Sequence, residues 1–79
     1  MIRILFFGPV AEQIGARELQ LDFSSGMTLQ DVVTQVQTQD AQAYPLVSFI
    51  AVNNTQIRDM NLVLHDHDEI AFMAKFSGG

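Results

Sequence analysis

The sequence of 79 residues predicts an α+β fold in which a mixed β-sheet packs on one main helix. Several short segments have strand patterns, among them 2–7, 17–23 and 69–75, whereas only one long amphipathic helix is visible, starting at residue 28. One helix is too few to cover both faces of a parallel sheet. We therefore expect a single sheet over one helix, with the first and last strands side by side at the centre.

The first segments carry clear patterns. In the first strand, alternate residues, two isoleucines and Phe6, face the core, and the strand ends at Gly8-Pro9. Residues 10–14 are expected to form a short helical turn, with proline at its start and Gly15 closing it. In 17–23, leucines and a phenylalanine alternate with Glu, Gln and Asp, which predicts a half-buried second strand.

The main helix begins at a recognisable cap. Thr28 and Asp31 have the spacing of a capping box, with Asp in place of the usual Glu or Gln. Four apolar residues then recur at helical spacing, which predicts a helix of about three turns. The polar segment 39–45 ends at a proline and is expected to be a loop. The residues predicted to face the core are Leu29, Val32, Val33 and Val36.

The second half of the chain predicts more strands. Residues 47–52 form a third strand whose buried side the pattern does not decide, followed by a turn at Asn53-Asn54, because asparagine tolerates positive φ. Residues 55–64 are expected to form a short edge strand and a crossover. The apolar residues of that segment predicted to be partly buried are Ile57, Leu62 and Leu64.

The last strand, 69–75, follows a polar turn at 65–68. Alternation directs Ile70 and Phe72 inward, and Glu69, Met73 and Lys75 outward. The turn and Glu69 bring together His, Asp and Glu, which are metal-ligand residue types. Consecutive strand residues point to opposite sides, so few of them can converge on one ion, and we interpret the segment as a solvated turn without a metal.

Composition excludes several classes of function. The absence of cysteine excludes disulfides, a thiolate nucleophile and cysteine-based zinc sites within the chain. Nine acidic and four basic residues give a formal charge of −5, which disfavours nucleic-acid binding and favours association with a basic partner surface. No phosphate-binding loop, nucleophile elbow or membrane span is visible, and 1–10 is too short and too poor in basic residues for a signal peptide. We expect a cytoplasmic domain that uses the active sites of other proteins.

An apolar surface is predicted beside the end of the last strand. If the first and last strands are neighbours, Phe7 and Met73 lie next to each other on the outer face of the sheet, together with Leu5. Exposed patches of this kind tend to be binding surfaces. The alternative is that residues 9–14 cover Phe7.

The chain ends in Gly78-Gly79, which divides it into a domain, 1–75, and a tail, 76–79. Two residues without Cβ leave the last carboxylate unobstructed and can pass through a narrow channel. The alternative is an ordinary frayed terminus.

The residues together resemble the MoaD family, the small subunits of molybdopterin synthase. The resemblance rests on the strand ending Leu5-Phe6-Phe7, the segment 10–15, the helix capped at Thr28, the strand into Val52-Asn53, residues 68–72 and Gly78-Gly79. The last two features are the most specific. Members of the family have the ubiquitin-like β-grasp fold, so the resemblance implies that fold here.

The resemblance implies a sulfur carrier that is part of an enzyme only when bound to its large subunit. An adenylating enzyme of the MoeB type, using ATP and magnesium, would activate Gly79, and a sulfur donor protein would convert it to a thiocarboxylate. The tail, with Gly78 as a slender approach, would enter the MoaE-type large subunit of a heterotetramer and donate sulfur to cyclic pyranopterin monophosphate. No cofactor is expected on this chain. The residues expected to contact partners are Phe7, Met73, Phe76 and Ser77.

The sequence also departs from the family pattern. Ala74-Lys75 stands where Pro-Pro is common, Phe76 is bulkier than the usual valine or isoleucine, and His67 occupies a position where a turn glycine is usual. A tail without prolines is less pre-organised for a partner. The alternatives that stay open are a ThiS-type carrier for thiazole synthesis, whose chains are typically shorter around 9–15, a ubiquitin-like protein modifier, and an interaction module with an inactive tail.

Overall fold

A computed structural model of the chain describes residues 1–74. The predicted site residues Phe76, Ser77, Gly78 and Gly79 lie outside the described residues, as does the predicted outward position of Lys75. The division into a domain and a tail stays a prediction.

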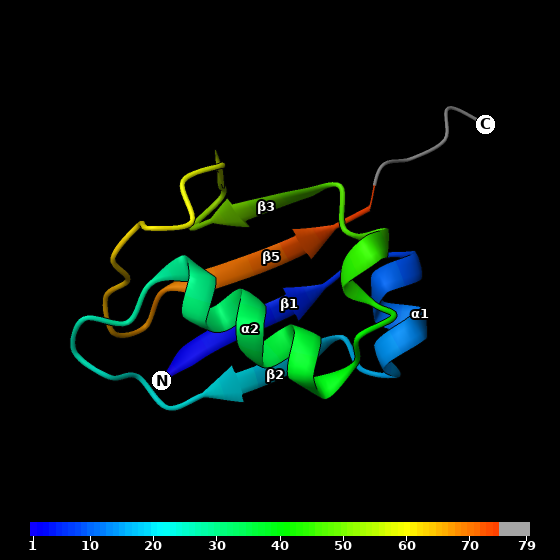
Figure 1. Cartoon of the computed structure of the whole chain (residues 1–79), viewed down its shortest axis with the longest axis horizontal. Helices are drawn as coiled ribbons and strands as arrows, with labels where there is room; N and C mark the ends of the chain where they lie inside the picture. The colour runs from blue at the N-terminus through cyan, green and yellow to red at the C-terminus, as the bar shows by residue number, and fades with distance from the viewer. Residues whose placement is uncertain (75–79) are drawn as a thin grey trace.

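The described residues form a five-stranded mixed sheet with one long helix across it (Figure 1). The strand order is β2-β1-β5-β3-β4; β1 and β5 are parallel at the centre, and the other neighbours are antiparallel. The prediction of a mixed sheet with its first and last strands adjacent is therefore confirmed. The elements are β1 (Ile2–Phe6), α1 (Pro9–Ile14), β2 (Glu18–Leu21), α2 (Leu29–Gln39), a 3-10 helix η1 (Tyr44–Leu46), β3 (Phe49–Val52), β4 (Thr55–Ile57) and β5 (Glu69–Met73).

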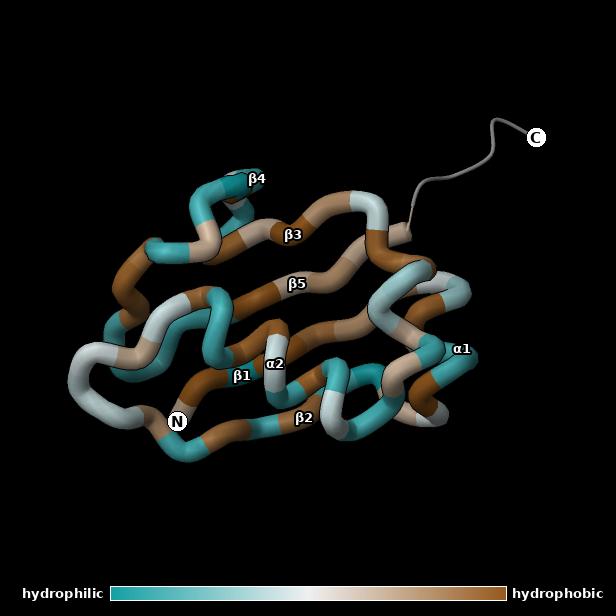
Figure 2. The backbone as a smooth tube through the Cα atoms, in the orientation of Figure 1, coloured by the Kyte–Doolittle hydropathy of each residue, from teal (hydrophilic) through white to brown (hydrophobic). Residues whose placement is uncertain are grey.

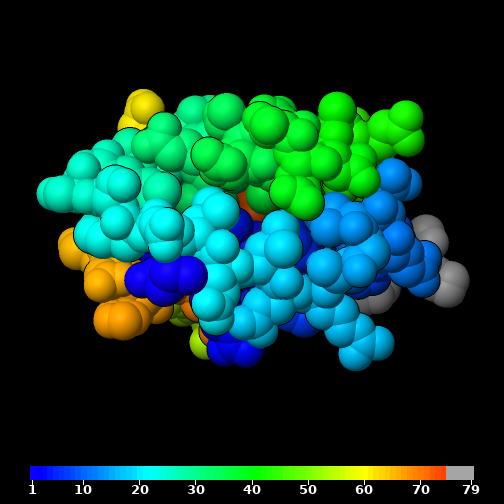
Figure 3. All heavy atoms as spheres, turned by 90° about the horizontal axis from the view of Figure 1, so that it is seen from below, coloured from blue at the N-terminus to red at the C-terminus, as the bar shows by residue number. Residues whose placement is uncertain are grey.

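The core lies between α2 and the inner face of the sheet. Seen from below in Figure 3, the side chains of α2, in green, lie directly on the strand layer. The rings of Phe6 and Phe72 stack with centroids 5.8 Å apart, which joins β1 to β5. Burying each large apolar side chain stabilises the fold by about 1.5–3 kcal/mol. The residues of the core cluster are the predicted helix positions Leu29, Val32, Val33 and Val36, together with Ile2, Ile4, Phe6, Val10, Ile50, Val52, Leu64, Ile70 and Phe72.

Local signals in the sequence set the ends of the elements. The Thr28 hydroxyl accepts a hydrogen bond from the Asp31 amide at 3.4 Å, and the Asp31 carboxylate accepts one from the Thr28 amide at 2.9 Å, so the capping box is present. Gly15, at φ 79°, closes α1, and Asn53 and Asn54 take positive φ between β3 and β4. These three predictions are confirmed.

Some boundaries differ from the sequence prediction. The second strand covers only four residues, because pairing with β1 ends at Ile2 and Leu21. Leu64 was expected to be partly buried, but it is 1% exposed, because the crossover that carries it packs into the core. Figure 2 shows apolar residues concentrated in the central strands and hydrophilic ones on β4 at the edge.

Candidate functional site

The outer face of the sheet, opposite α2, is apolar at one end. Paired residues on neighbouring strands share a face, and the register places Leu5 beside Ala71, Ala71 beside Ala51, and Phe49 beside Met73. None of these five belongs to the core cluster, which occupies the inner face, although Ala51 is already buried, at 6% exposed. Together with Phe7 they form what we call the apolar end, which consists of Leu5, Phe7, Phe49, Ala51, Ala71 and Met73.

Phe7 is the most exposed member of the apolar end. Its amide donates a hydrogen bond to the Phe72 carbonyl at 3.2 Å, which extends the parallel register of β1 and β5 by one residue and places Phe7 beside Met73. Phe7 remains 46% exposed, so the alternative in which residues 9–14 cover it is wrong. Gly8, at φ 56°, turns the chain away from the sheet into α1. The role of Phe7 and Met73 in partner binding stays a prediction.

The apolar end lies where the chain leaves the sheet. Met73 is the last residue of β5, and its carbonyl accepts a hydrogen bond from the Ser48 amide at 2.8 Å. This bond holds the end of β5 against the segment that enters β3. Ala74, the last described residue, therefore directly follows the apolar end at Met73.

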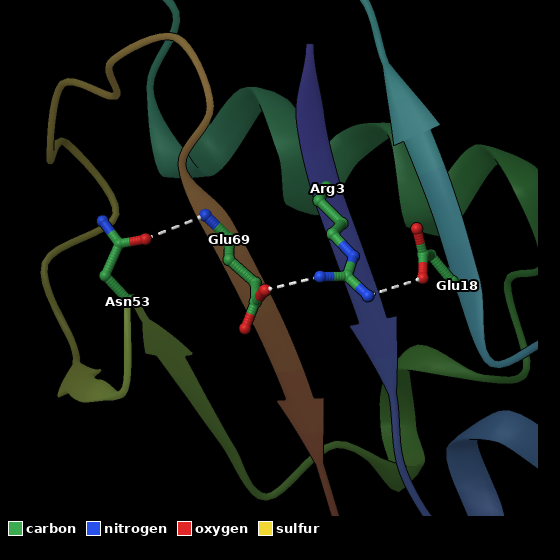
Figure 4. Close-up of polar contacts among 4 residues, drawn as sticks. All are labelled: Arg3, Glu18, Asn53 and Glu69. Carbon is green, nitrogen blue, oxygen red and sulfur yellow. Dashed lines mark hydrogen bonds and ion pairs between the residues drawn. The ribbon is translucent and has the colours of Figure 1, made fainter.

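The opposite end of the outer face, the polar end, is a network around Arg3 (Figure 4). The guanidinium of Arg3 bonds Glu18 on β2 at 3.0 Å and Glu69 on β5 at 3.1 Å. The hydrogen bond from Arg3 holds the pKa of Glu18 below its usual value, and Glu18, followed by Glu69, raises the pKa of Arg3. The Glu69 amide donates to the Asn53 side chain at 3.0 Å. This end thus pairs its charges within the chain.

The predicted polar turn is present between the crossover and β5. The Asp68 carboxylate accepts hydrogen bonds from the Asn53 side chain at 2.9 Å and from the His65 amide at 2.8 Å. His67 takes φ 73°, the left-handed conformation that glycine adopts without steric cost. Within residues 1–74, no group of three or more His, Cys, Asp and Glu side chains is arranged to hold a metal ion.

Sequence reasoning missed half of the apolar end. Residues 49–52 are all apolar, so their pattern gave no signal for which of them face outward. Pairing with β5 supplies that information, since Phe49 lies opposite Met73 and Ala51 opposite Ala71. Only strand order and register, which are long-range properties, identify Phe49, Ala51 and Ala71 as neighbours of Phe7.

These features define a class of protein. A small domain with a β-grasp arrangement of sheet and helix, and with an apolar outer end beside its last strand, is a ubiquitin-like domain. The chain belongs to the ThiS family, whose family model matches residues 4–79. No curated protein matches the sequence significantly.

Solved structures agree on the fold. Small archaeal modifier protein 1 from Haloferax volcanii superposes with a TM-score of 0.84 at 17% identity, over 99% of this chain and 98% of that one. The small archaeal modifier protein 1 from Methanosarcina acetivorans has a TM-score of 0.78 at 25% identity, covering 99% and 95%. A chain in the complex of subunits 1 and 2 of the molybdopterin-converting factor from Helicobacter pylori has a TM-score of 0.73 at 25% identity, covering 99% and 97%.

The family and the structures together narrow the class of function. The chain is a ThiS/MoaD-type ubiquitin-like sulfur carrier or modifier. No helix in residues 1–74 is long and apolar enough to cross a membrane.

Proposed function

We propose that this chain is the sulfur carrier subunit of a molybdopterin synthase. The observation that carries the proposal is the apolar end of the outer face, which lies directly beside Ala74, the last described residue before the glycine pair. Exposed apolar patches on small domains are typical of protein interaction sites. A partner that covers Phe7 and Met73 would receive the residues that follow Ala74.

The proposed chemistry takes place at the Gly79 carboxylate. An ionised carboxylate, with a pKa of roughly 3.5, is a poor electrophile. In the activating enzyme, a carboxylate oxygen would bond to the α-phosphorus of ATP and pyrophosphate would leave. A sulfide nucleophile would then attack the carbonyl carbon, AMP would leave, and a thiocarboxylate would remain. ATP and magnesium belong to the MoeB-type enzyme in this scheme, and a donor protein supplies the sulfur in the cell, which we expect to be the cytoplasm.

The proposed second partner is a MoaE-type large subunit. One structure similar to this chain is a complex of subunits 1 and 2 of a molybdopterin-converting factor, at 25% identity. The chain would contribute the sulfur, and the large subunit would bind cyclic pyranopterin monophosphate. Gly78 suits this arrangement because a residue without Cβ allows a close approach to the partner's backbone.

The direct test is intact-mass measurement. We expect that incubation with the host's MoeB-type enzyme, ATP, magnesium and sodium sulfide replaces one oxygen of the chain by sulfur. A variant lacking Gly79 should keep its thermal unfolding midpoint and gain no sulfur. Adding the large subunit and cyclic pyranopterin monophosphate should then yield molybdopterin. If neither an adenylate nor a thiocarboxylate forms, the proposal is wrong.

A protein modifier is the second candidate, because a modifier from Methanosarcina acetivorans matches this chain at the same 25% identity. Isopeptide-linked conjugates in a cell extract containing ATP would support it. A thiocarboxylate that yields no molybdopterin with the large subunit would instead favour a carrier for another client, such as thiazole synthesis.

A further inference from the structure

Two hollows flank the apolar end, and they differ in charge. The first, of about 390 Å³, lies between η1 and β4, and its walls include Phe49, Ile57 and Met60. Among the described residues that line it, Arg58 is the one charged at neutral pH. The second hollow, of about 500 Å³, lies beside α1 and contains Arg17 together with Glu12 and Glu18. Leu5 and Phe7 of the apolar end also line the second hollow. Arg17 forms no ion pair within residues 1–74 either, but the two glutamates offset its charge, so only the first hollow carries a net positive charge.

The first hollow, most of whose walls pack against the core, adjoins the apolar end at Phe49. Phe49 belongs to both, since it pairs with Met73 on the outer face and also lines the hollow. Ile57 pairs with Ile50, so one further step of the same antiparallel register brings Arg58 level with Phe49. A partner that covers Phe7, Met73 and Phe49 would extend onto Arg58.

Arg58 has no ion pair within residues 1–74, in contrast to Arg3, which has two. A guanidinium presents its donors in a planar fork that matches a carboxylate, and arginine is enriched among residues that dominate binding energy at interfaces. The same hollow also contains Gln56 and Tyr44, and none of the described residues that line it has a carboxylate. The hollow therefore combines apolar walls with a single unpaired cation.

We propose that the partner covering the apolar end places a carboxylate against Arg58 and an apolar side chain in the adjoining hollow. The inference rests on the proposed function, under which that partner is the MoaE-type large subunit. It goes against the overall charge of −5, which by itself favours a basic partner surface. A carboxylate facing Arg58 predicts that Arg58→Glu weakens binding. A basic partner surface attracted by the overall negative charge predicts that the same substitution tightens it.

The test is titration of the host's large subunit with two matched pairs of variants. Arg58→Glu should weaken binding by at least about tenfold, whereas Arg17→Glu, in the hollow that already contains acidic residues, should weaken it by less than about threefold. Gln56→Lys should tighten binding by about threefold. Gln37→Lys, which adds the same charge on the exposed side of α2, should change it by less than about twofold.

Each outcome bears on the proposal. Arg58 is exposed and pairs with no described residue, so Arg58→Glu should keep the wild-type thermal midpoint. Binding that is unchanged or tighter in Arg58→Glu, or equal effects of Gln56→Lys and Gln37→Lys, would overturn the inference while leaving the sulfur-carrier function intact. A wild-type chain that does not bind the large subunit would overturn both.

Discussion

The two ends of the outer face are built on the same central strands but differ in how their side chains interact. At the polar end, Arg3 joins Glu18 and Glu69 across three strands. At the apolar end, Phe7 is 46% exposed on the same face, beside Met73. At the polar end, the charged side chains of Arg3, Glu18 and Glu69 pair with one another. At the apolar end, exposed apolar surface is left that only another molecule can bury. Partner binding should therefore depend on one end and hardly on the other.

The largest effect should come from a charge placed on the apolar end. Phe7→Glu should weaken binding to the large subunit by at least about a hundredfold, because exposed aromatic anchors dominate interface energies and a carboxylate buried without a partner is costly. Its control is Gln20→Glu, the same new charge beside Arg3 at the polar end, which should leave binding nearly unchanged. Isothermal titration calorimetry measures both. Equal losses in the two variants would remove the distinction between the ends.

A smaller effect is expected at Phe49, and it tests how far the binding surface extends beyond β5. Phe49→Ala should weaken binding by about tenfold, since the ring is partly buried before the partner arrives and contributes less new buried area. Thr55→Ala, on the exposed edge strand β4, is the control. If Phe49→Ala binds like wild type while Phe7→Glu does not, the interface stops at β5.

Much of the fold was predictable because its signals are local. The capping box at Thr28, the left-handed glycine at 15 and the alternation of the last strand each depend on a few adjacent residues. Phe7 and Met73 were also predictable as outer-face neighbours, once the first and last strands were taken to be adjacent.

The rest of the site depends on pairing between residues far apart in the sequence. Phe49 was not predicted, because four consecutive apolar residues have no preferred face until β3 pairs with β5. The hollow beside Arg58 lies between β4 and η1. The 3-10 helix η1 was not predicted, because the sequence of 39–45 indicates only a loop. Residues 76–79, which carry the proposed chemistry, lie outside the described part of the chain.

The turn before β5 offers a stability test near the polar end. His67 has φ 73°, a conformation that costs a residue with Cβ about 1–2 kcal/mol. Glycine avoids this cost, but it also raises the conformational entropy of the unfolded chain, which destabilises the folded state by about 0.4–1 kcal/mol. His67→Gly should therefore raise the free energy of unfolding by about 0.5–1 kcal/mol. Urea unfolding measures this. His65→Gly, where φ is not positive, should lower it instead, and a similar change in both variants would contradict the role of the backbone conformation.

The smallest effect is the pH dependence of the polar end. Arg3 lowers the pKa of Glu18 in the folded chain, so unfolding at low pH takes up a proton there. The contribution of Glu18 is complete above the usual glutamate pKa of about 4.3 and is lost as the pH falls below it, through the lowered folded pKa. In urea unfolding between roughly pH 3 and pH 6, wild type should therefore lose more stability than Glu18→Gln toward the acid end. The difference should shrink at high salt, because this ion pair is exposed. Parallel pH profiles for the two proteins would show that Arg3 and Glu18 do not stabilise the polar end, and binding to the large subunit should be the same in both.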